Sequence, residues 1–408
     1  MNILYIAYSC SPNRGSEARI GWKIPIECAK KHKVTVITKK EHENEIREHL
    51  NNNPVDIDFY FVDIPQKYKM LFDDFFYLGR LHIWQNYALK KVRELCEKEK
   101  YDVIHQIAPV EFRSVADCGR IRDVKFICGP LGGGEYIPKG LSRYAIRYTY
   151  AEVIRCIINR LGMIKLKHKG VFEKSHVVMF ANAETKKYMN KVVPNQKSIN
   201  GFISEIAIDE NETAIRSKTE SDFEGKRIFL VSGRLVYRKG HAFLLKAFSE
   251  IPEELDYECY FAGEGKEMKR LKKMCRKYGL EEKVHFLGGV PFEEMQKVYK
   301  KSQVLIMPSI RETTGSVLLE AMAKGMPVIT IGRFGGMHFL NDNNSWLYDG
   351  NTHRELLNNL KCSVIECIQN NRKTAEKSHG ALLTAKNNTW EKKFCFYEAI
   401  YKKALLKK

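Results

Sequence analysis

The chain has 408 residues, a length that favours two domains over a single core. Its hydrophobic fraction of 44% and charged fraction of 29% are typical of folded globular proteins and exclude a disordered chain. The 68 Lys and Arg exceed the 49 Asp and Glu by 19, which favours anionic partners such as nucleic acid, lipid headgroups or phosphorylated small molecules.

The cysteine pattern and the lengths of the apolar runs indicate in which cellular compartment the protein is found. Eleven cysteines without a C-x-x-C pair predict reduced thiols, as in the cytosol. The chain opens on the apolar run Ile3–Ala7 and not on a charged segment followed by a long apolar one, and no apolar stretch reaches about 18 residues. We therefore expect neither a secretory signal nor a membrane span, and a cytoplasmic protein.

Short apolar runs alternate with helical segments, a pattern typical of strands joined by crossover helices. In the first half the predicted strands are Ile3–Ala7, Val34–Thr38, Asp58–Val62, Val103–His105, Lys125–Cys128 and Val177–Ala181. In the second half they are Ile228–Val231, Glu258–Ala262, Val284–Leu287, Val304–Met307 and Val328–Ile331. The pattern predicts an α/β fold with two parallel sheets, each covered by helices on both faces.

The segment Asn195–Gly225 separates these two sets of strands. It is polar, rich in Asn, Ser, Glu and Lys, and has little periodicity, which is typical of a linker. The last stretch, Asn388–Lys408, predicts a helix with one apolar side. We therefore predict an N-terminal domain at 1–200, a linker region at 201–225, a C-terminal domain at 226–385 and a final helix at 386–408.

Two carboxylates follow the predicted strand Val304–Met307. Glu312 lies in a polar turn, and Glu320 comes eight residues later, about two helical turns on if a helix that begins near Gly315 runs between them. Ligands of parallel sheets bind beyond the carboxyl ends of strands, where glycine lets the backbone approach closely. For an isolated pair at this spacing, the alternative that Glu312 caps the helix and Glu320 is a solvated helical charge is favoured.

A basic loop follows the predicted strand Ile228–Val231. It begins with Gly233 and Arg234 and ends with Lys239, just before a helix predicted from His241. Arg234 through its planar fork and Lys239 as a point charge suit a diphosphate. Taken alone, these residues also fit ordinary surface charges.

The order of these motifs is specific. Gly233-Arg234-Leu235, then Lys239-Gly240, then Gly263-Glu264-Gly265, then Glu312-x7-Glu320 resembles the retaining glycosyltransferases of family four, also called group 1. The resemblance covers essentially the whole chain and is strongest in its C-terminal half. It implies the GT-B fold, with two Rossmann-like domains facing across a cleft and the C-terminal helix packing back on the N-terminal domain.

The resemblance also implies the site. Arg234 and Lys239 neutralise the donor diphosphate, Glu312 holds hydroxyls of the donor sugar, and Glu320 holds the ribose of the nucleotide. The other donor-binding residues implied are Gly233, Gly263, Gly265, Thr314, Gly315 and Ser316.

In the N-terminal half, two loops after predicted strands resemble those of transferases that build bacterial surface polysaccharides. They contribute Gly15, Ser16, Glu17, Gly132, Gly133 and Gly134 as contacts, with close packing and helix capping as alternatives. His105 resembles the first of a histidine pair, but the second position holds Ile107. The predicted catalytic set is therefore Arg234, Lys239, Glu312 and His105, of which His105 fits equally a packed strand residue.

The implied activity is transfer of a sugar from a nucleotide-diphosphate sugar, with retention of configuration, to a glycan or lipid-linked acceptor of a capsule, exopolysaccharide or lipopolysaccharide. The family mechanism is front-face attack and requires no metal, and we expect no cofactor. Consistent with this, the sequence offers no convincing Asp-x-Asp metal motif and no His/Cys ligand spacing.

Gly140–Lys174 interleaves Arg and Lys with Tyr, Ile and Leu. Such a basic amphipathic segment fits an anionic membrane surface, and it fits a domain helix with a solvated basic face as well. The first interpretation predicts a peripheral protein on the inner face of the plasma membrane.

Three alternatives remain. A sugar-nucleotide 2-epimerase shares the architecture but uses no acceptor, and the Glu-x7-Glu segment favours transfer. A catalytically idle family member acting as a scaffold fits the missing second histidine. A nucleic-acid-binding protein fits the charge, but no recognition motif is present and the basic residues are spread through both halves, so no specific nucleic acid is expected.

Overall fold

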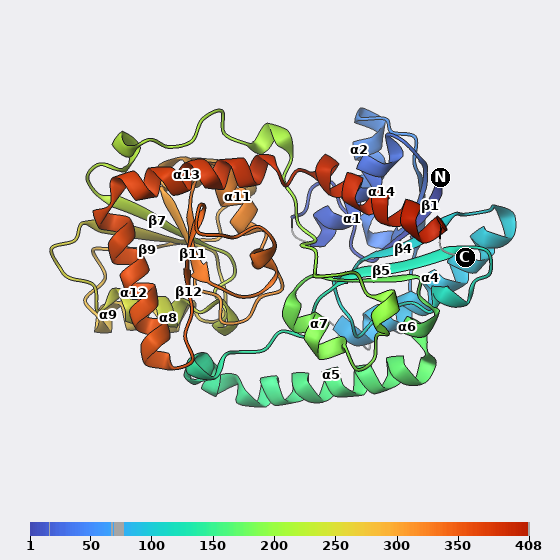
Figure 1. The fold of residues 1–408 in the computed structure, drawn as a ribbon, viewed down its shortest axis with the longest axis horizontal. Helices are drawn as coiled ribbons and strands as arrows, with labels where there is room; N and C mark the ends of the chain where they lie inside the picture. The colour runs from blue at the N-terminus through green and yellow to red at the C-terminus, as the bar shows by residue number, and fades with distance from the viewer. Residues whose placement is uncertain (16, 67, 69–76, 407–408) are drawn as a thin grey trace. The chain divides into compact units, whose positions relative to one another are not determined.

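A computed structural model of the chain describes residues 1–15, 17–66, 68 and 77–406 (Figure 1). The chain forms two compact units. The first comprises Met1–Gly134, Arg155–Ile206 and Trp390–Lys408, and the second comprises Glu135–Ile154 and Ala207–Thr389. Each unit contains one six-stranded sheet among the described residues.

The sheet of the first unit has the strand order β3-β2-β1-β4-β5-β6, with every neighbouring pair parallel. Its strands are β1 (Asn2–Ala7), β2 (Lys33–Lys39), β3 (Asp58–Val62), β4 (Val103–Ala108), β5 (Lys125–Leu131) and β6 (Val177–Phe180). The helices include α1 (Glu17–Ala29), α2 (Glu43–Asn52), α4 (Tyr77–Lys98), α6 (Val171–Lys174), α7 (Ala183–Met189) and α14 (Trp390–Leu406). The strand order reverses between β1 and β4.

The sheet of the second unit has the order β12-β11-β10-β7-β8-β9 and is likewise parallel. Its strands are β7 (Arg227–Ser232), β8 (Tyr257–Ala262), β9 (Val284–Gly288), β10 (Val304–Met307), β11 (Val328–Ile331) and β12 (Ser345–Tyr348). The helices include α8 (His241–Phe248), α9 (Met268–Lys277), α10 (Phe292–Lys301), α11 (Val317–Ala323), α12 (His353–Gln369) and α13 (Asn371–Lys386). Here the order reverses between β7 and β10.

Both sheets are buried on both faces, which explains why their central strands read as continuous apolar runs. Every residue of Ile3–Ala7 in β1 and of Val304–Met307 in β10 is buried. The predicted α/β class with two Rossmann-like parallel sheets is confirmed, and all eleven predicted strands are present. The sequence missed β12, whose four residues follow an Asn-rich turn.

The unit boundaries differ from the predicted ones at Glu135–Ile154, which belongs to the second unit. Within that unit, the hydroxyl of Tyr144 lies 2.9 Å from Nε2 of His353. The ring of Tyr148 stacks on that of Tyr237 at 4.2 Å. These aromatic contacts, which are distant in sequence, account for the difference.

The predicted linker region is also packed more closely than its polar composition indicates. Ile203, Ile206 and Ile208 are buried, and the Ile203 amide donates to the carbonyl oxygen of Phe180 at 2.8 Å. In the first unit, Nζ of Lys393 in α14 donates to the carbonyl oxygen of Ser204 at 2.8 Å.

No helix in the part of the chain that the structure describes carries an apolar stretch long enough to cross a membrane.

Candidate functional site

Two loops of the second unit leave the sheet where its strand order reverses. The loop Gly233–Gly240 follows β7, and the segment Pro308–Ser316 follows the neighbouring strand β10. In open parallel sheets the crevice at such a reversal, beyond the carboxyl ends of the strands, is where ligands bind. The two motifs that the sequence analysis selected therefore share one location.

Backbone contacts hold these two loops together. The amides of Ile310 and Arg311 donate to the carbonyl oxygen of Arg238 at 2.9 and 3.2 Å. Gly240 has φ of +71°, and a Cβ there would overlap the carbonyl oxygen of Pro308. Glycine is therefore required at position 240 both by conformation and by space.

Glu312 is the centre of the polar contacts between the loops. Its carboxylate accepts a hydrogen bond from Nζ of Lys239 and lies 3.5 Å from the guanidinium of Arg238. Burial by itself raises the pKa of Glu312, but the charges of Lys239 and Arg238 and the Lys239 hydrogen bond outweigh it, so the pKa is lowered. Glu312 is thus an ionised, oriented acceptor.

Arg234 differs from these three residues because it is exposed and has no polar side-chain partner within the described ranges. Arg238 and Lys239 share the Glu312 carboxylate and Arg234 adds a third cation to the same loop, so the loop has an excess of positive charge. An unpaired guanidinium beside such an excess suits a phosphorylated ligand, which would gain charge-assisted hydrogen bonds. The sequence analysis missed Arg238, although it directly precedes Lys239.

Glu320 belongs to the first turn of α11 and is connected to the end of β7 through a tyrosine. The hydroxyl of Tyr299 donates to Oε2 of Glu320 at 3.0 Å and is also hydrogen-bonded to Ser232, the last residue of β7. Burial, followed by the charge of Glu320, raises the pKa of Tyr299 well above its ordinary value. Tyr299, which the sequence did not suggest, therefore orients this carboxylate.

Gly263 and Gly265 pack against the basic loop. A Cβ on Gly263 would overlap the carbonyl oxygen of Gly233, and one on Gly265 would overlap that of Leu235. The amide of Leu235 in turn donates to the carbonyl oxygen of Glu264 at 2.7 Å. Both glycines thus have a packing role beside the predicted site.

The turn before α11 contains the remaining predicted donor residues. Thr314 is buried, Gly315 has φ of +92°, and Ser316 is the N-cap residue of α11. The helix begins at Val317, two residues after Gly315, and Glu312 lies in the preceding turn, as predicted.

In the first unit, His105 is not placed as a catalytic residue. It lies within β4, is fully buried, and uses both ring nitrogens. Its Nε2 donates to the carbonyl oxygen of Gly129 at 2.7 Å, and its Nδ1 accepts from the hydroxyl of Tyr401 at 2.6 Å. Burial lowers its pKa to about 4. The catalytic assignment of His105 is therefore corrected to a structural one.

The loops after β1, β4 and β5 meet in the first unit. Oε1 of Glu17 accepts the amide of Val110 at 2.6 Å, and burial followed by the nearby charge of Glu111 raises the pKa of Glu17. A Cβ on Gly133 would lie 3.0 Å from Oε1 of Glu111, which also accepts from Nε of Arg113 at 2.6 Å. The structure therefore brings Glu17 and Gly133 together around a Glu111–Arg113 ion pair that sequence reasoning missed.

The other predicted N-terminal contacts have separate surroundings. Gly15 is exposed with open space around it, and Ser16 lies outside the described residues. Gly132 accepts the amide of Phe112 at 3.1 Å through its carbonyl oxygen. Gly134 packs closely against Thr185, as expected from the alternative of tertiary packing.

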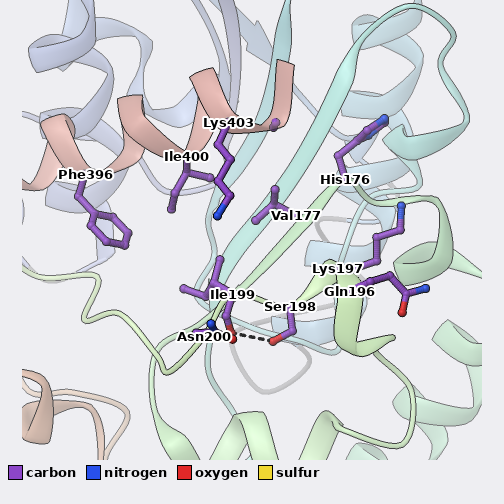
Figure 2. A pocket seen from close by; sticks show the side chains of 11 residues that line it. His176, Val177, Gln196, Lys197, Ser198, Ile199, Asn200, Phe396, Ile400 and Lys403 are labelled. Atoms are coloured by element: carbon purple, nitrogen blue, oxygen red, sulfur yellow. Dashed lines mark hydrogen bonds between the residues drawn. The ribbon is translucent and has the colours of Figure 1, made fainter. Parts of the chain in front are cut away.

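Three cavities are lined by described residues of the first unit, and two of them lie at opposite ends of the sheet. One of about 360 Å³ lies between Gln196–Asn200 and the Phe396, Ile400 and Lys403 side chains of α14, at the amino end of β6 (Figure 2). That edge is opposite to the carboxyl ends of the strands. The other, of about 340 Å³, follows β1, β2 and β3. Its lining residues are Tyr8, Lys39, Lys40, Glu41, Val62, Asp63, Ile64, Arg80 and Trp84.

Within the described ranges, no group of three or more His, Cys, Asp and Glu side chains forms a candidate metal site. The prediction that the reaction needs no metal stays a prediction.

Comparison with known proteins finds a family match in the second unit. A sequence model described as glycosyl transferases group 1 matches residues 212–377, the segment that contains every site residue of the second unit described above. Residues 212–377 of this chain therefore resemble the group 1 glycosyltransferases. The matched segment begins within the predicted linker region and ends in α13.

Named relatives match this chain over part of its length. It is 35% identical to an uncharacterized glycosyltransferase, MJ1607 of Methanocaldococcus jannaschii, over 130 residues, which are 31% of this chain and 33% of that protein. It is 29% identical to the lipopolysaccharide glucosyltransferase WaaG of Escherichia coli over 123 residues, 30% of this chain and 32% of WaaG. The chain thus spans about a third of the length of these relatives.

A solved structure shares the fold over almost the whole chain. The structure of Anabaena HepE in complex with UDP superposes with a TM-score of 0.62 at 15% identity, covering 98% of this chain and 100% of HepE. At this identity the likeness shows the fold alone, which is the GT-B fold expected from the motifs.

Proposed function

We propose that the protein is a retaining glycosyltransferase that moves a sugar from a nucleotide-diphosphate sugar to a glycan or lipid-linked acceptor during bacterial surface polysaccharide synthesis. One observation carries the proposal. Glu312 is held by Lys239 and Arg238 beside the unpaired Arg234, at the strand reversal of a group 1 domain. The solved complex of HepE with UDP and the name of WaaG support the donor class and the pathway.

In this proposal Arg234 and Lys239 bind the donor diphosphate, and Glu312 accepts hydrogen bonds from hydroxyls of the donor sugar. Glu320, oriented by Tyr299, binds the ribose hydroxyls. The amides of Thr314, Gly315 and Ser316 complete the phosphate contacts. When the diphosphate approaches, Lys239 is already positioned by its ion pair with Glu312, so little side-chain entropy is lost on binding.

The chemical step breaks the bond between the anomeric carbon and the diphosphate oxygen, and it forms a bond from the same face to an acceptor hydroxyl oxygen. The acceptor proton passes to the departing diphosphate oxygen. Negative charge accumulates on that diphosphate in the transition state, where Arg234 and Lys239 stabilise it. No metal enters this scheme.

We further propose that the acceptor binds to the N-terminal unit. The cavity of about 340 Å³ beyond β1, β2 and β3 supports this, because the largely buried Tyr8 and Trp84 form part of its wall and Lys39 and Arg80 supply charge. Aromatic faces combined with polar groups are suited to a sugar ring. An acceptor attached to lipid would hold the enzyme in the cytoplasm on the inner face of the plasma membrane.

The test is a thermal-shift screen of sugar nucleotides, followed by product analysis with and without acceptor. We expect Arg234→Ala and Glu320→Ala to lose the ligand-induced shift while keeping the melting temperature of the free protein. Arg276→Ala, which removes an exposed arginine of α9, is the matched control and keeps the shift. An unchanged shift in both site variants would remove these side chains from the donor site.

Product analysis separates the competing activities. Conversion of the donor sugar to its epimer without acceptor would identify a 2-epimerase. Donor binding without turnover against any tested acceptor would favour the scaffold alternative. Appearance of the transferred sugar on the acceptor, with release of the nucleoside diphosphate, is the result expected here.

A further inference from the structure

Helix α5 (Thr149–Lys169), drawn in green in Figure 1, carries several apolar side chains that are in contact with solvent. Six large apolar side chains of this helix are between 51% and 68% exposed. They are Tyr150, Val153, Ile154, Ile157, Leu161 and Ile164. Single exposed apolar residues are normal on protein surfaces, but contiguous apolar patches mark interaction sites.

The spacing of these residues places them on one face. They follow Tyr150 by 3, 4, 7, 11 and 14 residues, which are the intervals that bring side chains to the same side of an α-helix. At about 100° per residue, all six lie within an arc of about 100°. Within the first unit, which includes α5 from Arg155 onward, Ile157, Leu161 and Ile164 form an apolar stripe.

The opposite face of α5 is the one that packs on the protein. Asn159 is buried and its Nδ2 donates to the carbonyl oxygen of Gly133 at 3.1 Å. Leu166 is buried, and Gly162 lies against the side chain of Arg113. Since the helix already uses this face for its own packing, the apolar stripe is free to bind another surface.

Cations border the stripe on both sides. At helical spacing, Arg160 and Lys167 lie along one edge, and Lys165 and Lys169 lie along the other. All four are exposed. Glu152 is the single acidic residue of α5, and it is paired with Arg311 at 2.9 Å. The outward side of the helix is therefore apolar along its centre and positive along its edges.

We propose that α5 lies in the plane of an anionic lipid surface, with the stripe inserted between headgroups and the flanking cations bound to lipid phosphates. This deepens the proposed peripheral location and rests on it. The charge arrangement favours lipid over a protein partner, because lysine is depleted in the centre of protein interfaces whereas in-plane membrane helices combine apolar residues with Lys and Arg.

The test measures binding of the full chain to vesicles of mixed phosphatidylglycerol and phosphatidylcholine by co-sedimentation at low salt. Ile157→Ser/Leu161→Ser removes part of the stripe, and we expect at least about a tenfold weaker partition. Arg160→Gln/Lys167→Gln removes two flanking cations, and we expect about 30-fold weaker partition at low salt, with a smaller difference at high salt.

Two control variants match these changes elsewhere on the chain. Ile215→Ser/Leu383→Ser removes two other exposed apolar side chains, and Lys273→Gln/Lys277→Gln removes two exposed cations of α9. Both controls are expected to bind vesicles as the parent chain does.

Three results would overturn the inference. They are no binding of the parent chain to anionic vesicles, equal binding by all variants, or an equal loss in the controls. A parent chain that elutes as a dimer and becomes a monomer on Ile157→Ser/Leu161→Ser, without vesicle binding, would instead assign the stripe to a second copy of the chain.

The experiment also distinguishes this inference from the proposed donor chemistry. All four variants should retain the thermal shift caused by the sugar nucleotide, because none changes a residue of the donor site. If the parent chain binds vesicles but shows no thermal shift with any sugar nucleotide, the proposed donor site is refuted and the proposed lipid-binding surface is supported. The reverse pattern would refute only the lipid surface.

Discussion

Replacing Lys239 by methionine tests whether the Lys239–Glu312 pair serves the ligand or the fold. Both side chains are largely buried, and breaking a buried ion pair by removing one partner costs about 3–5 kcal/mol. Arg238 stays 3.5 Å from the carboxylate, so we expect a smaller loss of about 2–3 kcal/mol in the free energy of unfolding.

The same variant has a defined pH dependence. In the parent chain the lowered pKa of Glu312 stabilises the fold above the pKa of the unfolded carboxyl, and this contribution is lost as pH falls through the folded pKa. In the variant without Lys239, less positive charge opposes the effect of burial on Glu312, so the pKa of Glu312 rises. The stability difference between variant and parent should therefore be largest near neutral pH and shrink toward about pH 4.

A second substitution completes the test. The double variant Lys239→Met/Glu312→Gln also removes the Glu312 charge that lost its partner. We therefore expect its free energy of unfolding to return to within about 1 kcal/mol of that of the parent. Binding of nucleoside diphosphates, measured by calorimetry, should stay at least about tenfold weaker in both variants, since a hydrogen bond to a charged group contributes about 1.5–3 kcal/mol. Parental affinity in Lys239→Met, or no recovery of stability in the double variant, would refute the reasoning.

Three further predictions follow from single residues. Arg234→Ala should weaken nucleoside diphosphate binding by about 10–100-fold in calorimetry without changing the melting temperature, because the side chain is exposed and has no described polar partner. Gly240→Ala should lower stability by about 2 kcal/mol or more in urea unfolding, since Cβ would overlap the Pro308 carbonyl at a positive φ. His105→Gln should flatten the loss of stability as pH falls from about 6.5 to about 4, because unfolded histidine takes up a proton in that range whereas buried His105 does not.

Periodicity predicted most of the fold because burial leaves a local signature. Strands covered on both faces, such as β1 and β10, are apolar throughout and can be recognised from a few adjacent residues. The edge strand β12 lacks this signature, since its four residues follow directly on the polar turn Asn341–Asn344 and pair with a single neighbour. Its pairing with β11 depends on a contact outside the segment itself.

Candidate site residues could be selected from the sequence where several charged residues occur together in one short loop. Arg234, Lys239 and Glu312 lie in short motifs after recognisable strands, and motif order carried their assignment. His105 could not be judged in this way, because its partner Tyr401 is 296 residues away and belongs to the last helix. The ion pair of Glu111 and Arg113 likewise has no sequence signal beyond two charges after a strand.

The close approach of the backbone at Gly263 and Gly265 affects how substitutions there can be interpreted. Each glycine touches a carbonyl of the Gly233–Leu235 segment, so any side chain would push that segment away from its position. A mutational scan scored by enzymatic output would therefore rank both positions with the ligand-binding residues, although the cause is steric. A parallel scan scored by protein abundance would reveal the difference, because loss at Arg234 leaves abundance intact whereas loss at these glycines lowers it.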